Sequence, residues 1–175
     1  MTEREKTASP GPVVSSAHLA SGAMPELSEL EFGLIMCSNA FNRWAARCMA
    51  AAGEIGLSPL EVLCLHAVNH RGRAKRLADI CLVMNIEDTH LVSYALKKLE
   101  GRGLVKSGRA GKEKTVAITP AGEEACLAYR AIREAALVRA VKEMGVDGPQ
   151  VSRLAALLRA LSGQYDQAAR AAASL

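Results

Sequence analysis

The stretch of sequence that decides the fold is residues 88–120, which read DTHLVSYALKKLEGRGLVKSGRAGKEKTVAITP. Near its start, Val92, Leu96 and Leu99 recur at the spacing that places them on one face of an α-helix. Asp88 precedes this pattern and is a good N-cap, and the two glycines after it end the pattern. The sequence therefore predicts an amphipathic helix with its apolar side turned toward a core.

Two short alternating runs follow that helix, at residues 104–107 and 115–118. The connection at residues 110–113 reads AGKE, so the pattern predicts a β-hairpin with a basic tip. Thr119 and Pro120 then suit the N-cap and first position of another helix.

Two further helices are predicted in residues 58–87. Ser58, Pro59 and Glu61 form the pattern of a capping box with proline at its first helical position, and this helix should run to about His70. A short helix from about Lys75 follows, with Leu77, Ile80, Cys81 and Met84 on its buried side, and then a tight turn. Three helices and a hairpin in residues 58–119 are the order of a winged helix-turn-helix, in which the last of the three helices enters the major groove of DNA.

Composition agrees with a mostly helical fold and narrows the class of protein. Only 3 % of the 175 residues are aromatic, which excludes an all-β sandwich or barrel. No apolar run reaches the roughly 18 residues of a membrane span and no secretory h-region follows Met1, so we expect a cytoplasmic protein with no membrane contact. The five cysteines include no C-x-x-C pair, and we expect buried thiols and no metal or other cofactor.

Positive charge is concentrated in residues 71–114, where eleven lysines and arginines face five acidic residues. This local charge of +6 exceeds the +4 of the whole chain. A surface that meets phosphates has such a bias, and so does a solvated basic face. The hairpin directly after the third helix favours DNA.

Residues 30–165 resemble the MarR-type regulators, a family of dimeric winged-helix proteins. The resemblance rests on LSPLEVL at 57–63, LADI at 77–80, KLEGRGLV at 98–105 and AITPAG at 117–122. It implies a homodimer made by the first and last helices that binds a pseudo-palindromic operator and represses or activates transcription, with repression the expected direction. It also implies a small aromatic effector that releases the DNA. The hairpin tip departs from the family pattern, because RAGKEK at 109–114 replaces an acidic residue followed by arginine.

The DNA-binding residues are predicted from the helix geometry and from the charge. With the apolar face inward, the helix turns five side chains outward, and the cations lie before the second helix of the module and on the hairpin. The predicted DNA-binding residues are Thr89, His90, Ser93, Tyr94, Lys97, Arg73, Lys75, Arg76, Lys106, Arg109, Lys112 and Lys114. Tyr94 has an alternative as a core residue against the preceding helix.

The flanking helices are the predicted dimer interface. The last helix carries an apolar seam that steps by three and four, which is typical of packing against a partner helix, although it could instead fold back on the first helix. The predicted interface residues are Leu34, Phe41, Val151, Leu154, Leu158, Leu161 and Tyr165. The predicted organisation is a flexible arm at 1–25, a dimerisation helix at 27–56, the winged helix at 57–119 and dimerisation helices at 120–175.

Other functions find less support in the sequence. His66 and His70 have metal-ligand spacing on one helix, but no carboxylate partner or nucleophile motif accompanies them, so we expect no enzyme. Cys37 and Cys48 share a helix face and leave a thiol-based redox sensor as one alternative. A winged helix that binds only protein is another.

Overall fold

The chain folds as helices with one small sheet, and the computed structural model describes residues 11–175. It forms two compact units, one that ends at Cys126 and one that begins at Leu127. The elements in chain order are η1 (Ala17–Ser21), α1 (Pro25–Ala51), α2 (Pro59–Asn69), η2 (His70–Gly72), β1 (Lys75–Arg76), α3 (Leu77–Met84), α4 (Thr89–Gly101), β2 (Val105–Ala110), β3 (Glu113–Ile118), α5 (Pro120–Arg133), η3 (Glu134–Val138), α6 (Arg139–Glu143) and α7 (Gly148–Ala172).

The helix starts predicted from capping residues are confirmed. At α2, the Ser58 hydroxyl accepts the Glu61 N–H at 3.3 Å and the Glu61 carboxylate accepts the Ser58 N–H at 2.8 Å, a complete capping box. At α4, Asp88 Oδ1 accepts the His90 N–H at 2.9 Å. At α5, the Thr119 hydroxyl accepts the Gly122 N–H at 3.1 Å. These caps fix where the winged-helix elements begin.

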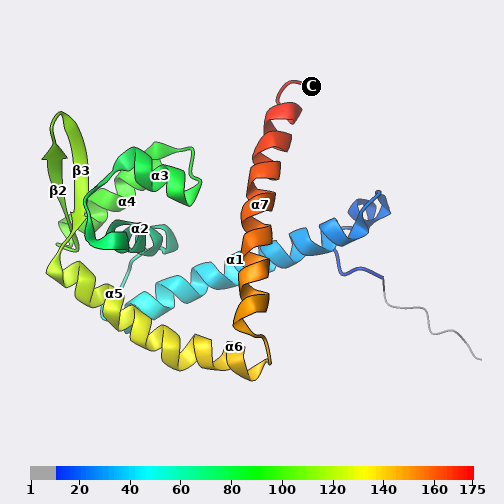
Figure 1. The fold of residues 1–175 in the computed structure, drawn as a ribbon, viewed down its shortest axis with the longest axis horizontal. Helices are drawn as coiled ribbons and strands as arrows, with labels where there is room; N and C mark the ends of the chain where they lie inside the picture. The colour runs from blue at the N-terminus through cyan, green and yellow to red at the C-terminus, as the bar shows by residue number, and fades with distance from the viewer. Residues whose placement is uncertain (1–10) are drawn as a thin grey trace, which may run out of the picture. The chain divides into compact units, whose positions relative to one another are not determined.

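The sheet has three antiparallel strands in the order β1-β3-β2. The predicted hairpin is confirmed, with β2 and β3 joined by a two-residue turn in which Gly111 has φ +62°. The two-residue strand β1 was not predicted: Lys75 and Arg76, expected to begin a helix, pair with Val116 and Thr115 of β3. Figure 1 shows the hairpin beside α3 and α4. Strand β1 thus ties the start of α3 to the β2–β3 hairpin, residues 105–118, which is the wing of the winged helix.

The core of the first unit lies where α2, α3 and α4 pack together. Helix α2 contacts α1, α3, α4 and β3. The largest side chains that are almost completely buried are Met49, Val62, Leu65, Val68, Ile80, Val92, Leu99 and Leu104. Val92 and Leu99 come from the periodic pattern of the predicted helix, so its apolar face does turn inward.

Part of the segment before α1 is helical. The sequence predicted a flexible arm at residues 1–25, but residues 17–21 form the 3₁₀-helix η1, and the hydroxyl of buried Ser28 donates to Leu19 O at 2.7 Å. This hydrogen bond holds η1 against the first turn of α1. Residues 1–10 of the predicted arm lie outside the described residues.

The second unit contains the rest of α5 and the C-terminal helices. The predicted helix from Thr119 to about Met144 is interrupted by one turn of π-helix, η3, after which α6 continues it. Helix α7 begins at a capping box between Asp147 and Gln150. None of the residues of α7 is buried. Within residues 11–175, no helix is long and apolar enough to cross a membrane.

Candidate nucleic-acid interface

Helix α4 presents the predicted polar face to solvent. Val92 and Leu99 are fully buried on its inner side, while Thr89, His90 and Lys97 are exposed on its outer side. Ser93 is half-buried. Tyr94 is 76 % exposed, so its alternative assignment as a core residue is wrong. An aromatic ring in the middle of an exposed helical face is available to a ligand at no cost in fold stability.

Two basic residues at the C-terminal end of α4, Lys98 and Arg102, hold this helix in place. Lys98 Nζ lies 2.9 Å from Glu61 Oε2 and donates to Gly56 O at 3.1 Å. Arg102 pairs with Glu54 at 3.2 Å and donates to Ile55 O at 2.7 Å. These contacts join α4 to the loop before α2 and to the α2 cap, so Lys98 and Arg102 position the helix.

The carboxylate of Glu61 is the buried centre of this arrangement. Burial acts to raise its pKa, but the hydrogen bonds from Lys98 and from Ser58 together bring the pKa below the ordinary value for glutamate. Glu61 therefore stays ionised at neutral pH and serves the α2 cap and the α4 contact at once.

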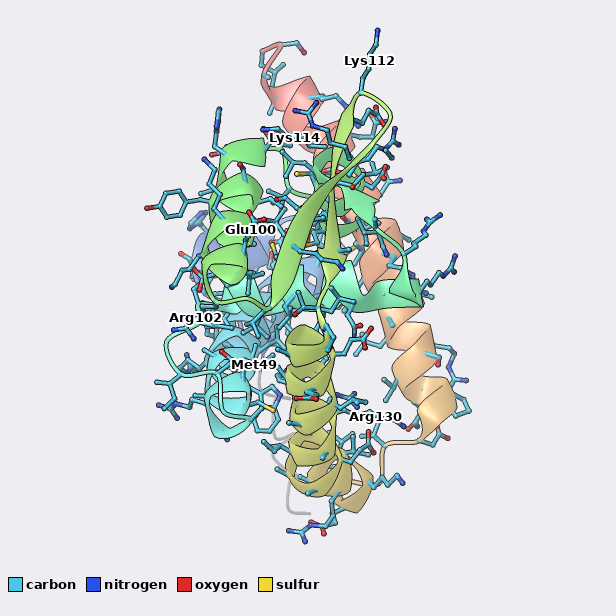
Figure 2. The ribbon with its side chains drawn as sticks, turned by 90° about the vertical axis from the view of Figure 1, so that its left-hand side faces the viewer. Met49, Glu100, Arg102, Lys112, Lys114 and Arg130 are labelled. Atoms are coloured by element: carbon cyan, nitrogen blue, oxygen red, sulfur yellow. The ribbon has the colours of Figure 1, made fainter. Side chains whose placement is uncertain are left out.

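Four exposed cations lie on the wing, as predicted: Lys106, Arg109, Lys112 and Lys114. In the part of the chain that the structure describes, none of them forms an ion pair with a carboxylate. Arg109 lies directly opposite Lys114 in the β2–β3 register, and Lys112 is at the hairpin tip (Figure 2). Like charges opposite each other on paired strands are destabilising, and an anion between them would relieve the repulsion.

Glu100 joins α4 to the wing. Its Oε1 accepts the N–H of Ser107 in β2 at 2.8 Å, and this hydrogen bond lowers the pKa of Glu100. Figure 2 shows Glu100 on α4 next to the hairpin that carries Lys114. In the sequence, Glu100 is only a negative charge on a neutral helix, because the contact depends on a register that the sequence does not reveal. It fixes the wing relative to the exposed face of α4.

The predicted cations at the start of α3 have different environments. Arg76 is ion-paired with Asp79 at 2.8 Å and with Glu113 of the wing at 3.3 Å, so a phosphate would compete with two carboxylates for it. Lys75 is buried, and its ammonium donates to the carbonyls of Val68, His70 and Arg73. The prediction that Lys75 contacts DNA is therefore wrong, because strand β1 turns this side chain inward. Arg73 is exposed.

Four of the five cysteines are buried, whereas the sequence led us to expect all of them to be buried. Cys48, Cys64, Cys81 and Cys126 are buried as expected, but Cys37 on α1 is exposed. Burial raises the pKa of Cys64 to about 12 and that of Cys126 to about 11, so both stay protonated at neutral pH. Among residues 11–175, no group of three histidine, cysteine or acidic side chains is placed to hold a metal ion.

The predicted interface residues lie on α1 and α7. Leu34 and Phe41 are exposed on α1, and Val151, Leu154 and Tyr165 are exposed on α7. Leu158 and Leu161 are half-buried.

Comparison with known proteins supports the fold. Residues 57–122 match the family model described as a winged helix DNA-binding domain. No curated protein has a sequence that matches this chain.

Several solved structures share the fold over most of the chain. A MarR-family transcriptional regulator from Rhodococcus sp. RHA1 is 16 % identical over 81 % of this chain and 95 % of its own, with a TM-score of 0.63. CouR from Rhodococcus jostii RHA1, solved with p-coumaroyl-CoA, is 17 % identical over 83 % of this chain and 95 % of its own, with a TM-score of 0.64. A cysteine-to-serine mutant of MarR from E. coli, solved with operator DNA, is 14 % identical over 81 % and 99 %, with a TM-score of 0.62.

These likenesses extend beyond the residues of the family model to the flanking helices, as the coverage of more than four fifths of the chain requires. Residues 57–122 are thus a winged helix, and the chain has the fold of the MarR-family transcriptional regulators.

Proposed function

We propose that the protein is a transcriptional regulator of the MarR type that binds a pseudo-palindromic DNA operator as a homodimer. The observation that carries this proposal is the wing, where Arg109 and Lys114 face each other across the hairpin and Lys112 is at its tip. None of these three cations forms an ion pair with a carboxylate of residues 11–175. A phosphate backbone supplies the anions that this arrangement lacks.

The exposed face of α4 would supply the sequence preference. Ser93, Tyr94 and Lys97 lie on one side of the helix, and hydroxyl and ammonium groups there can contact base edges in the major groove. Thr89 and His90 lie in the first turn, where recognition helices approach the bases. Because Lys98 and Arg102 hold α4 in place, most of the affinity for phosphates would come from the wing.

A homodimer is supported by apolar surface that one chain leaves open. Residues 33–41 of α1 are all exposed, and they include Leu34, Ile35, Met36 and Phe41. Helix α7 has 25 residues and none is buried, although it carries Val151, Leu154, Leu157 and Tyr165. An isolated helix of this kind gains too little from burial to be stable, and a second copy of the chain is the partner that the fold suggests.

The structures of relatives in fold agree with this role. MarR from E. coli was solved with operator DNA and CouR with p-coumaroyl-CoA, which supports both operator binding and release by a small effector for this chain. We assign the protein a binding role and no catalytic one, and we place it with the genomic DNA in the cytoplasm. The raised pKa values of Cys64 and Cys126 argue against those two thiols as redox sensors.

The test is the salt dependence of DNA binding. A variant with Arg109, Lys112 and Lys114 all replaced by alanine is compared with a control in which Arg130, Arg139 and Lys142 are replaced. Both variants lose three positive charges. Binding to a 30-base-pair duplex is followed by fluorescence anisotropy between about 50 and 300 mM salt.

Each phosphate contact contributes about 0.9 to the slope of log affinity against log salt concentration, so the wing variant should lose between two and three units of slope. The control should keep the wild-type slope within about half a unit. A wing variant with the wild-type slope would contradict the proposal.

A further inference from the structure

The winged helix contains a pocket of about 520 Å³ between the end of α2, η2, β1 and α3. None of its lining residues comes from α1, α4 or α5. One part of its wall is apolar, formed by Ala67, Ile80 and Val83. The other part carries the cations Arg71, Arg73 and Lys75. The pocket therefore combines an apolar wall with a positively charged one.

The positive charge in this pocket is only partly offset by the described residues. None of Arg71, Arg73 and Lys75 forms an ion pair with a carboxylate in residues 11–175. Asp79 is the one acidic residue of the lining, and its two carboxylate oxygens lie 2.8 and 3.0 Å from nitrogens of Arg76. Its charge is therefore largely used by another arginine.

The environment of the buried ammonium of Lys75 disfavours its positive charge. Burial lowers its pKa and the nearby charges of Arg73 and Arg71 lower it further, while the carboxylate of Asp79 acts in the opposite direction. All three ammonium donors are directed at backbone carbonyls, which stabilise the charge without cancelling it. A bound anion would reduce the repulsion among these three cations.

The backbone at Arg71 supports a role for its side chain. Arg71 has φ 62° and ψ 17°, the left-handed conformation that glycine adopts without strain and that is unfavourable for other residues. A glycine would fit this turn better, and the next residue, Gly72, also has positive φ. The turn thus has an arginine at a position whose backbone conformation favours glycine.

We propose that this pocket binds a small organic anion with an apolar body. Its charged group is held by Arg71 and Arg73 above the ammonium of Lys75, and its body packs on Ala67, Ile80 and Val83. The ligand acts on the wing through β1, because Lys75 pairs with Val116 and Arg76 with Thr115 of β3. That regulatory consequence rests on the proposed DNA-binding function, whereas binding of the anion does not.

The binding test uses isothermal titration calorimetry at constant ionic strength with three probes. They are 2-naphthoate, its neutral counterpart 2-naphthalenemethanol, and acetate, which has the charge without the body. The variant Arg71→Asn removes the cation and keeps a residue that tolerates positive φ. Lys142→Gln on α6 removes one exposed charge outside the pocket and is the matched control.

We expect 2-naphthoate to bind the wild type and the control equally, and both other probes to bind at least tenfold more weakly. Arg71→Asn should weaken 2-naphthoate binding about tenfold, as loss of a charge-assisted hydrogen bond does. Equal binding of 2-naphthoate and the neutral alcohol would overturn the proposal. So would an undiminished affinity in Arg71→Asn, or no binding of 2-naphthoate to folded wild type.

A second measurement separates this site from the proposed function. The affinity of the wild type and of Arg71→Asn for one duplex is measured with and without 2-naphthoate. If 2-naphthoate changes the DNA affinity of the wild type, and Arg71→Asn needs about tenfold more 2-naphthoate for the same change, coupling through β1 is supported. If 2-naphthoate leaves the DNA affinity of the wild type unchanged, the coupling is overturned, and the calorimetry alone decides whether the site exists. Failure to bind DNA without any ligand counts against the proposed function alone.

Discussion

Replacing Gly122 by alanine tests how α5 is seated on the base of the wing. A Cβ atom at this position would lie 2.1 Å from Leu104 O and 2.6 Å from Ile118 Cδ1, whereas real Cβ atoms stay at least 3.0 Å from such neighbours. The backbone would therefore have to move by about 0.9 Å at this contact. Leu104 O cannot withdraw freely, because it accepts the Thr119 N–H at 3.1 Å and lies 2.9 Å from the Thr119 hydroxyl.

The expected cost combines two effects. Forcing an extra methyl group into a packed site costs about 1–3 kcal/mol, and weakening the hydrogen bonds around Thr119 costs about 1 kcal/mol each. We expect Gly122→Ala to lower the free energy of unfolding by about 3 kcal/mol or more. Because α5 starts at this contact, we also expect the hairpin amides of β2 to exchange faster with solvent.

The measurement is urea unfolding followed by circular dichroism at one fixed protein concentration. Gly101→Ala is the matched control, since a Cβ there meets no atom within 4 Å and the residue closes helix α4. Alanine should leave stability unchanged or raise it by up to about 1 kcal/mol at that position. If Gly122→Ala were as stable as the wild type within 0.5 kcal/mol, the account of this helix start would be refuted.

Three further predictions concern Glu61, the buried thiols and helix α7. The pKa of Glu61 is lowered in the folded state, so its contribution to stability is present above its unfolded pKa of about 4.3. This contribution is lost as pH falls through the folded pKa. The urea midpoint of the wild type should therefore fall more steeply in acid than that of Glu61→Gln. Burial raises the pKa of Cys64 to about 12 and that of Cys126 to about 11, so both thiols should resist iodoacetamide at pH 8 until urea unfolds the chain. Mass spectrometry of the alkylated protein measures this protection. Rapid labelling of the folded protein would be the contrary result. Leu158→Asp with Leu161→Asp should give monomer or unfolded protein in sedimentation, since unpaired charge would enter the proposed interface, and a wild-type monomer at micromolar concentration would count against that interface.

Local signals in the sequence were enough to predict most of the winged helix. Ser58, Asp88 and Thr119 cap the helices they were expected to cap, because an N-cap depends on residues only two or three positions away. The apolar face of α4 was readable for the same reason. Tyr94 was left between two environments by its spacing alone, and only the packing of α4 on α2 decides for solvent.

The errors concern contacts between residues that are distant in sequence. Strand β1 exists only because β3 lies beside it, 39 to 41 residues later in register, so Lys75 turns inward against expectation. The ion pair between Arg76 and Glu113 has the same origin. Residues 134–138 are rich in alanine and carry no helix-breaking residue, so the π-helical turn has no local signal. Cys37 is exposed because the helix face it shares with Cys48 is covered only over part of α1.

Selection of DNA sequences from a random duplex library by the purified wild-type protein tests the central claim most directly. We expect enrichment of an inverted repeat whose half-site centres lie about one helical turn, or a multiple of it, apart, since a homodimer presents two copies of α4. Tyr94→Ala and Lys97→Ala should keep binding to unselected DNA and lose roughly 1–3 kcal/mol of preference for the selected repeat. No enriched sequence, or an enriched sequence that both variants bind with the full wild-type preference, would contradict the account.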